Sequence, residues 1–574
     1  MVNSVQSTQT GRRPVSRVAR RSKSTKLSAD GGNTIKRFNE FWKYSKQNNH
    51  DRWKRNYKLY NNIRVAESYK GISNTFVPMV FSTIETLTAA LASGKPSIDF
   101  VPQDMYKYIA SYQKNGRKPD LSALNAQFDY FWDKDNWDVK SIKTIRSTFM
   151  YGLGGEWFSF EGGAPHLTCL GVRDAIYDPT LSDPNDLVDP ERIGEHWGGR
   201  RYLTTLDALR EEKIINPETG ELVPRFSNLA KVTPGSIPGD DTEKQLKETF
   251  LGAVGDTSSL VEVIEIHDKD YVRSVANRGP EIECRKNELG IVPLSLGRFI
   301  ADESLICGKS IIDPIAKAQE YLNDVTNQRL DAVTDALLPE RTIDPKFADW
   351  IPRLKKAPGT VYPFGQGALS IVEQPQVPVA AFTETQNMKN EIREATGADQ
   401  VVKGVSSSQN QTATEIKAQL NQAGQRFEIY ARMLERETFY QRAKIVLRML
   451  LKYGDRVNLI PTTSMDGPKF RVLRLDDFDT TYEPQIRLET TVKSQQYQSQ
   501  QKADASFKAL IADPTNDLWE VKKIMYPKMY DLSEEELDRI IGKEKPQPTQ
   551  PADPIQHNAP QQITDLQTIG AMNG

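Results

Sequence analysis

The sequence predicts an α+β protein, because long helical segments and short alternating strands fall in separate parts of the chain. Residues 313–338 and 411–453 carry apolar side chains at spacings of three and four over many turns, which is typical of long amphipathic helices. Residues 260–267 (LVEVIEIH) alternate as a strand does, and residues 270–275 and 282–285 are its expected antiparallel partners.

The composition indicates a globular but polar chain with room for several domains. Its 574 residues are 38% hydrophobic and 26% charged, with a formal net charge of -1. No apolar run approaches the roughly 18 residues that cross a bilayer, and the N-terminus lacks a signal-peptide core, so we expect folding in a cytosol without a membrane. The cysteines share no metal-binding spacing and are expected to be buried free thiols: Cys169, Cys284 and Cys307.

Charge is unevenly distributed along the chain. Residues 11–29 hold many cations and no acidic residue: Arg12, Arg13, Arg17, Arg20, Arg21, Lys23 and Lys26. Without a periodic apolar face, residues 1–32 are predicted to form a disordered basic arm, which either neutralises phosphates or serves as a partner-binding tail. Residues 543–574 are rich in Pro and Gln and are predicted to be a disordered tail.

The first helical regions are aromatic and basic. Residues 33–61 are predicted to form one helix, or two with a break near Asn48–Asn49. Their tryptophans are expected to pack in a core more than to stack on bases. In residues 73–102, Pro78 suits the first turn of a helix that ends before a short strand.

Residues 121–151 read as one helix, which Gly152 and the glycines after it end. Short strands and repeated Asp-Pro turns follow, and residues 200–212 are expected to form a brief helix. With the strands over 260–285, these segments predict a domain built around an antiparallel sheet.

The long helix 313–338 has clear start and stop signals. Asp313 is expected to cap it, Pro314 stands at its first position, and Pro339 ends it. Residues 339–378 are punctuated by Pro and Gly, with two short strand candidates at 360–362 and 369–372. A further helix is predicted over 379–396.

A polar, glycine-containing loop over 397–410 precedes the longest helix. Residues 411–453 begin with the capping box Thr412 and Glu415, and Gly454 is expected to form a left-handed C-terminal cap. At 1.5 Å per residue this helix is roughly 60 Å long. Its apolar stripe comprises Ile416, Leu420, Ala423, Phe427, Tyr430 and Leu434 and then, after a small phase shift, Phe439, Ala443, Val446 and Leu450.

The C-terminal part returns to short elements. Strands are predicted around residues 470–475 and 486–489, followed by helices over 494–511, 518–525 and 533–541.

No catalytic constellation is found in the sequence. Gly308–Ser310 resembles the end of a phosphate-binding loop, but Glu303 replaces the glycine that this loop requires, so a strand-to-helix turn is predicted. The five histidines show no metal-ligand spacing, and Asp before Pro is mainly a turn signal. The sequence therefore predicts a protein without catalysis, cofactor or metal.

The order of these parts resembles the portal proteins of tailed bacteriophages, from about residue 33 to 541. SNTFVPMVFSTIETLTAAL (73–91) is similar to their early helix, and GLGG (152–155) with the following strands to their wing. GKSIIDPIAKAQEYLNDVTNQRLDAV (308–333) is similar to the glycine turn and first stem helix. The most specific match is ATGADQVVKGVSSSQNQTATEIKAQL (395–420), which resembles the end of a stem helix, the tunnel loop and the start of the long wing helix.

The resemblance implies a portal-type subunit with an α/β wing, long stem helices, a small α/β clip and a helical C-terminal crown. Its expected parts are the wing 33–312, stem helix 1 at 313–338, the clip 339–378, stem helix 2 at 379–396, the tunnel loop 397–410, the long wing helix and following strands 411–493, and the crown 494–542.

As a portal protein, the chain is expected to form a ring, usually of twelve subunits, at one capsid vertex of the virion, after assembly in the host cytoplasm. Double-stranded DNA would pass through the channel during packaging and ejection. The packaging motor (terminase), the neck or tail adaptors and a capsid or scaffold protein are the expected partners, with no cofactor.

The resemblance also implies site residues. The tunnel loop would bring to the DNA Val401, Val402, Lys403, Ser406, Ser407 and Ser408. Stem carboxylates that would repel DNA phosphates at short range are Asp324, Asp331 and Asp335. The clip would dock partners through Lys346, Phe347, Trp350, Arg353, Lys355 and Lys356, although its aromatic residues could equally pack between neighbouring clips.

Two alternative functions follow from the same sequence. One is a helical nucleic-acid enzyme subunit that uses the basic arm and the Gly308–Ser310 turn. The other is a non-viral ring scaffold.

Overall fold

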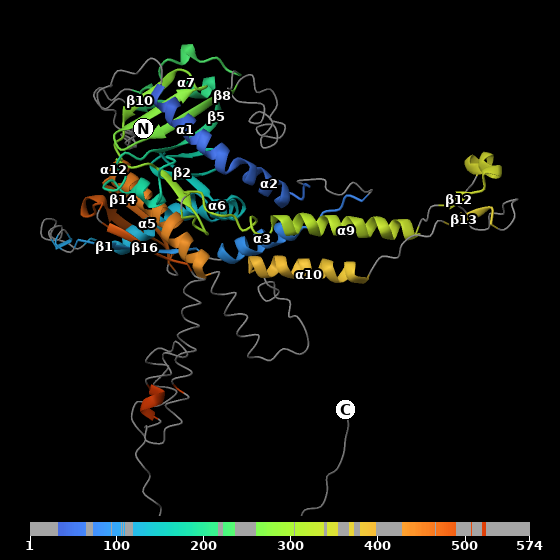
Figure 1. The fold of residues 1–574 in the computed structure, drawn as a ribbon. Helices are drawn as coiled ribbons and strands as arrows, with labels where there is room; N and C mark the ends of the chain where they lie inside the picture. The colour runs from blue at the N-terminus through green and yellow to red at the C-terminus, as the bar shows by residue number, and fades with distance from the viewer. Residues whose placement is uncertain are drawn as a thin grey trace, which may run out of the picture. The chain divides into compact units, whose positions relative to one another are not determined.

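The computed structural model shows separate helical and antiparallel-strand layers, as expected for an α+β fold (Figure 1). It describes residues 32–64, 73–92, 95–104, 106, 108–109, 119–215, 222–235, 260–303, 305–337, 341–353, 367–371, 379–397, 428–464, 467–480, 482–488, 507 and 519–523. Residues 1–492 form one compact unit and residues 493–574 a second. The predicted basic arm, almost all of the tunnel loop, most of the crown and the C-terminal tail lie outside the described residues.

The aromatic N-terminal region forms two helices, α1 (Gly32–Asn48) and α2 (His50–Tyr60), so the break predicted near Asn48–Asn49 is confirmed. Phe38, Phe41 and Trp53 are each at most 1% exposed. They pack in one core with residues of the sheets, including Tyr177, whose ring lies 5.0 Å from that of Phe41. These aromatic residues therefore stabilise the fold by burial.

The next helices are α3 (Met79–Leu91), α5 (Leu121–Lys134) and α6 (Trp137–Tyr151). The prediction of one helix over residues 121–151 is wrong, because Asn136 adopts a left-handed conformation with φ 50° between α5 and α6. The Asp135 carboxylate stabilises this break by accepting hydrogen bonds from Trp137 Nε1 and from the backbone N–H of Leu167, both at 2.8 Å. Side-chain hydrogen bonds of Asp compete with a continuing helix in this way.

Gly152 ends α6 with φ 81°, as expected for a helix C-terminus. A methyl group there would also clash with the carbonyl oxygen of Gly308. The backbones of Gly152 and Gly308 therefore lie in close contact, which brings the end of α6 against the turn before α9.

Two antiparallel sheets follow. The three-stranded sheet has the order β11-β2-β3 and the five-stranded sheet the order β10-β9-β8-β5-β4. Their strands are β2 (Gly154–Glu161), β3 (Ala164–Leu170), β4 (Ala175–Tyr177), β5 (Gly198–Thr205), β8 (Leu260–His267), β9 (Tyr271–Ala276), β10 (Glu281–Lys286) and β11 (Leu294–Gly297). The predicted antiparallel pairing of 260–267 with 270–275 is confirmed, with Val263 opposite Ala276. The predicted pairing of 260–267 with 282–285 is wrong, because β10 pairs with β9, with Cys284 opposite Arg273.

The brief helix predicted over 200–212 is confirmed only in its second half, because the first half is a strand. β5 runs to Thr205, whose hydroxyl then caps the short helix α7 (Leu206–Glu211) by accepting from Ala208 N–H. Residues 200–205 form a strand instead of a helix because β5 pairs with β8 along its whole length. Gly199 permits this pairing, since a methyl group there would clash with the Glu265 carbonyl.

The described residues also form four smaller strand pairs and four short 3-10 helices. The pairs are β1 (Ser97–Pro102) with β16 (Tyr482–Arg487), β6 (Lys213–Ile215) with β7 (Leu222–Pro224), β12 (Arg341–Ile343) with β13 (Leu369–Ile371), and β14 (Val457–Ser464) with β15 (Gly467–Arg474). The 3-10 turns are η1 (Pro184–Val188), η2 (Leu229–Lys231), η4 (Pro345–Arg353) and η6 (Leu475–Asp477).

The expected stem helices are α9 (Ala316–Leu337) and α10 (Val379–Thr396), which lie side by side (Figure 1). Their lengths correspond to about 33 and 27 Å. Of the expected clip strands, 369–372 is confirmed as β13; its partner is β12, which the sequence did not predict, and residues 360–362 lie outside the described part.

The end of the long helix is described from residue 428 to Tyr453 and is not one uninterrupted α-helix. A π-helical turn, η5 (Leu434–Phe439), precedes α12 (Tyr440–Tyr453). The phase shift between Leu434 and Phe439 in the sequence marks this turn, because a wider turn rotates the apolar stripe.

The left-handed cap predicted at Gly454 is wrong, since this residue is extended with φ -69° and ψ 156°. Glycine is required at position 454 for another reason, because a methyl group there would clash with the Leu450 carbonyl oxygen.

Candidate functional site

One carboxylate fixes the turn that leads into α9, the first expected stem helix. Asp313 accepts hydrogen bonds from the backbone N–H of Ser310 at 2.8 Å, from Arg55 at 2.7 Å and from Asn56 at 3.1 Å. Arg52 lies 3.5 Å from the same group. Because α9 begins at Ala316, the prediction that Asp313 caps this helix is wrong. Asp313 instead closes the turn before α9 and ties that turn to α2.

The turn before α9 is Gly308–Ser310, which is structural as predicted. Lys309 N–H donates to Ile300 O at 2.8 Å, and Ser310 Oγ donates to Phe149 O at 2.7 Å. Nearby, burial raises the pKa of the Cys307 thiol to about 11, so this thiol stays protonated and unreactive.

One face of α9 holds an extended segment of the chain through polar side chains at every fourth residue. The face consists of Gln319, Asn323, Asn327 and Asp331, and we call it the amide ladder. Its hydrogen bonds to residues 73–77 are Gln319 Nε2 to Val77 O at 2.7 Å, Val77 N to Asn323 Oδ1 at 3.0 Å, Thr75 N to Asn327 Oδ1 at 2.7 Å, Asn327 Nδ2 to Thr75 O at 2.9 Å, and Ser73 N to Asp331 Oδ1 at 2.7 Å.

The ladder works because two repeats agree. Four residues of α-helix rise about 6 Å, and two residues of an extended strand rise about 6.6 Å. Side chains one turn apart on α9 therefore meet every second backbone unit of the strand, as a neighbouring strand would.

The three predicted stem carboxylates have different surroundings. Asp331 belongs to the amide ladder and is 7% exposed, and Asp324 forms an ion pair with Arg64 at 2.5 Å. Asp335 is half-buried near the end of α9. Two of these carboxylates thus bind other parts of their own subunit.

The second expected stem helix, α10, buries only a narrow stripe of side chains. Among its described side chains, the fully buried ones are Thr385, Ile392 and Thr396. Phe382 is 49% exposed although the Arg329 guanidinium lies 5.0 Å from its ring centroid. Most of the α10 surface therefore remains available to other molecules.

The predicted clip and tunnel-loop residues are only partly described. Lys346 is exposed and Phe347 is half-buried, both in η4, which also contains the backbone of Trp350 and Arg353. Lys355 and Lys356 lie outside the described residues. So do all six tunnel-loop residues, Val401, Val402, Lys403, Ser406, Ser407 and Ser408.

The π turn η5 is a joint between the long helix and the three-stranded sheet. Gln441 accepts from Leu296 N at 2.8 Å and donates to Leu296 O at 3.0 Å, which satisfies the free edge of β11. The Glu437 carboxylate accepts hydrogen bonds from the backbone N–H and from the guanidinium of Arg298, both at 2.9 Å. Burial raises the pKa of Glu437, while the Arg298 guanidinium acts in the opposite direction. Gly297 is required here, because a methyl group would clash with Thr438.

The deepest ion pair of the described chain joins α12 to β2. Arg442 is 1% exposed and donates to Glu156, which is 0% exposed, at 2.6 and 3.1 Å. Its remaining terminal nitrogen donates to Ser141 Oγ at 3.0 Å. The guanidinium also lies 4.7 to 5.6 Å from the ring centroids of Phe439, Trp132 and Trp137. Sequence reasoning missed this pair, because its partners are 286 residues apart.

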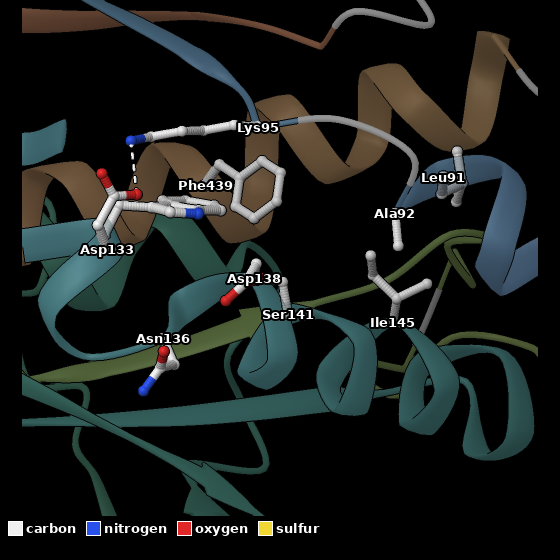
Figure 2. Close-up of a pocket in the computed structure, with 10 residues that line it drawn as sticks. Leu91, Ala92, Lys95, Asp133, Asn136, Asp138, Ser141, Ile145 and Phe439 are labelled. Atoms are coloured by element: carbon white, nitrogen blue, oxygen red, sulfur yellow. Dashed lines mark hydrogen bonds and ion pairs between the residues drawn. The ribbon is translucent and has the colours of Figure 1, made fainter.

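A pocket of about 440 Å³ opens beside this ion pair (Figure 2). It lies between the end of α3, the end of α5, the first turns of α6 and the π turn. Its lining residues are Leu91, Ala92, Lys95, Trp132, Asp133, Asn136, Asp138, Ser141, Ile145 and Phe439.

A second pocket, of about 570 Å³, is lined by residues of β2, β5 and β8. Its charged residues pair with one another: Arg200 Nε donates to Glu265 at 2.9 Å, and Arg225 Nη2 donates to the same carboxylate at 3.4 Å. Because cations and carboxylates are already matched, this network favours a structural role.

The described residues hold neither a metal-binding cluster nor a membrane span. No group of three His, Cys, Asp or Glu side chains in this part of the chain could hold a metal ion. Among the same residues, no helix has the length and apolar character needed to cross a membrane.

Comparison with known proteins identifies one family. The family model described as phage SU10 portal protein matches residues 271–568, just over half of the chain. The matched region begins in β9 and includes α9, α10 and the π turn. No curated protein matches the chain.

Proposed function

Because this chain belongs to the phage SU10 portal protein family, we propose that copies of it form the ring at the portal vertex of a phage capsid and that double-stranded DNA passes through the ring. Phage portal proteins are structural components of the virion, not enzymes, and in general they assemble as rings that contact the capsid and DNA. Membership in this family disfavours the alternative of a nucleic-acid enzyme subunit, as does the structural Gly308–Ser310 turn.

The observation that best supports the proposal is the α9–α10 pair. Asp313 and the amide ladder fix α9 to its own subunit, whereas α10 leaves most of its surface uncovered. A helix with this exposure is suited to contacts with the next subunit of a ring, in which neighbouring surfaces differ from each other.

The stem supplies the wall of the proposed channel. Asp324 and Asp331 make contacts within the subunit, so of the three predicted carboxylates we assign Asp335 to the lumen. A carboxylate there repels DNA phosphates at short range, which lets DNA slide without adhering. The tunnel loop, with Val401 to Lys403 and the serines at 406–408, would line the narrowest part.

The remaining assignments concern partners. We place the packaging motor, and later the neck or tail adaptors, on the clip around η4, with Lys346 and Phe347 in the docking surface. The ring would contain twelve subunits, and a capsid or scaffold protein would surround the wing.

Ring assembly is the direct test of this function. We expect negative-stain images of the purified full-length protein to show closed rings with an open central pore. Light scattering should report a mass of many subunits at micromolar concentration. A stable monomer at both low and high salt would contradict the proposal, whereas a mixture of ring sizes would still support it.

Shortening the tunnel loop separates passage of DNA from assembly. Deletion of residues 401–408 is expected to abolish DNA packaging or retention, because the constriction is removed, and to leave ring formation unchanged. Packaged DNA is measured by nuclease protection, and rings are counted by negative-stain imaging. If the deletion prevents ring assembly instead, these residues are a structural joint and the tunnel assignment is wrong.

A further inference from the structure

The pocket beside the Arg442–Glu156 pair has one apolar end and one charged end. Figure 2 shows Leu91, Ala92 and Ile145 at one end, with Lys95 and Asp133 at the other. Asp138 and Ser141 point into the space between these two ends. A volume of about 440 Å³ lies in the range of small-ligand sites, which is about 300–1,000 Å³.

The aromatic side chains of this pocket already bind a guanidinium. Phe439 and Trp132 line the pocket, and the Arg442 guanidinium lies 4.7 and 5.0 Å from their ring centroids. Ser141, which accepts a hydrogen bond from Arg442, also lines it. A cation is attracted to the face of an aromatic ring, and each ring has two faces. The pocket therefore offers a second cation the same kinds of partner that Arg442 uses.

The charged end is negative on balance. Lys95 Nζ lies 3.0 Å from Asp133 and 3.1 Å from Asp129, so one cation faces two carboxylates. Asp138 adds a third carboxylate, which forms no ion pair with the residues that the structure describes. Asp129 lies outside the pocket lining, so the charged residues that line the pocket are Lys95, Asp133 and Asp138. Two carboxylates and one ammonium leave a formal net charge of -1, which favours a basic side chain over an acidic or neutral one.

We propose that this pocket binds an arginine or lysine side chain of the basic arm, residues 11–29 of this protein. The arm carries seven cations and no acidic residue, so its charge complements the pocket.

The basic arm is also long enough to reach the pocket. Thirty-one residues precede Gly32 and span up to about 100 Å when extended, whereas a compact unit of this size has a radius of gyration of about 23 Å. The arm of the same subunit and that of a neighbouring copy both satisfy the proposal.

Site-specific crosslinking of the full-length protein tests this interaction. A photoreactive benzoylphenylalanine replaces Ala92, and crosslinked peptides are identified by mass spectrometry. We expect the pocket to crosslink to residues 11–29. The double variant D133N/D138N removes the carboxylate partners of the bound side chain. It should lower the yield of crosslinks to residues 11–29 by about five-fold for each ion pair that is lost. Raising the salt concentration from about 0.05 to 0.5 M should also lower it.

Two controls make the result specific. D207N removes a carboxylate that is 84% exposed on α7, far along the chain from the pocket, and should leave the crosslink unchanged. Thermal melting of each variant verifies folding. As an independent readout, trypsin should cleave the arm faster in D133N/D138N than in D207N, because bound Arg and Lys side chains are protected. The proposal is overturned if the crosslinks map only outside residues 11–29, if none forms, or if D133N/D138N changes neither the yield nor the rate of cleavage.

Discussion

Replacing Arg442 by methionine is expected to lower the free energy of unfolding by about 3–5 kcal/mol, because it leaves a buried carboxylate without its partner. Glu156 is 0% exposed, and the Arg442 guanidinium supplies both of its short ion-pair contacts. Methionine keeps much of the volume among the aromatic rings, so the destabilisation reports the charge more than a cavity. Urea denaturation of wild type and variant under identical conditions measures the difference.

Two further variants separate the buried charge from other effects. The double variant R442M/E156Q should be more stable than R442M alone, since it removes the uncompensated charge. R432M is the matched control: Arg432 is 61% exposed and pairs with Glu428 one turn away, so its replacement should cost about 0.5 kcal/mol or less. A destabilisation by R442M no larger than that by R432M would show that the buried pair does not stabilise the fold.

Much of the fold could be predicted from local patterns. Alternation over residues 260–267 predicted β8, and the apolar spacing over 313–338 predicted α9. The phase shift between Leu434 and Phe439 was visible in the sequence, but its cause was not. The π turn is stabilised by contacts with Ser295 of β11 and with Arg298. Such long-range contacts override local helix propensity.

The candidate site was less predictable, because polar side chains on a helix look alike whether they face solvent or a second chain segment. Asp324 and Asp331 were expected in the lumen, and their contacts with Arg64 and the backbone N–H of Ser73 could not be read from the sequence. One signal was available. Gln319, Asn323, Asn327 and Asp331 recur at every fourth position. A regular row of three amides and one carboxylate on one helix face is suited to pairing with backbone groups. The Arg442–Glu156 pair left no comparable local signal.

Replacing Asn327 by leucine is expected to release the extended segment at residues 73–77 from α9. Asn327 is 0% exposed, and its amide both accepts from and donates to the backbone of Thr75. Leucine has a similar size but offers neither group, so two backbone polar groups are left without their partners. Each unpartnered group costs about 1–3 kcal/mol where it stays buried, and a total of about 2–4 kcal/mol is expected in urea denaturation.

Hydrogen exchange locates this effect within the ladder. In wild type, the Thr75 and Val77 amides donate to Asn327 and Asn323 and should exchange slowly. In N327L, exchange at Thr75 should accelerate most, and exchange at Val77 should change less, because its own ladder residue is intact. D335N alters a half-buried carboxylate on the same helix outside the ladder and serves as the control, with an expected change within about 0.5 kcal/mol. Equal Thr75 exchange in N327L and D335N would mean that the amide ladder does not hold this segment. If N327L also lowers the yield of rings while the wing remains folded, the ladder positions α9 for the proposed stem as well as stabilising the subunit.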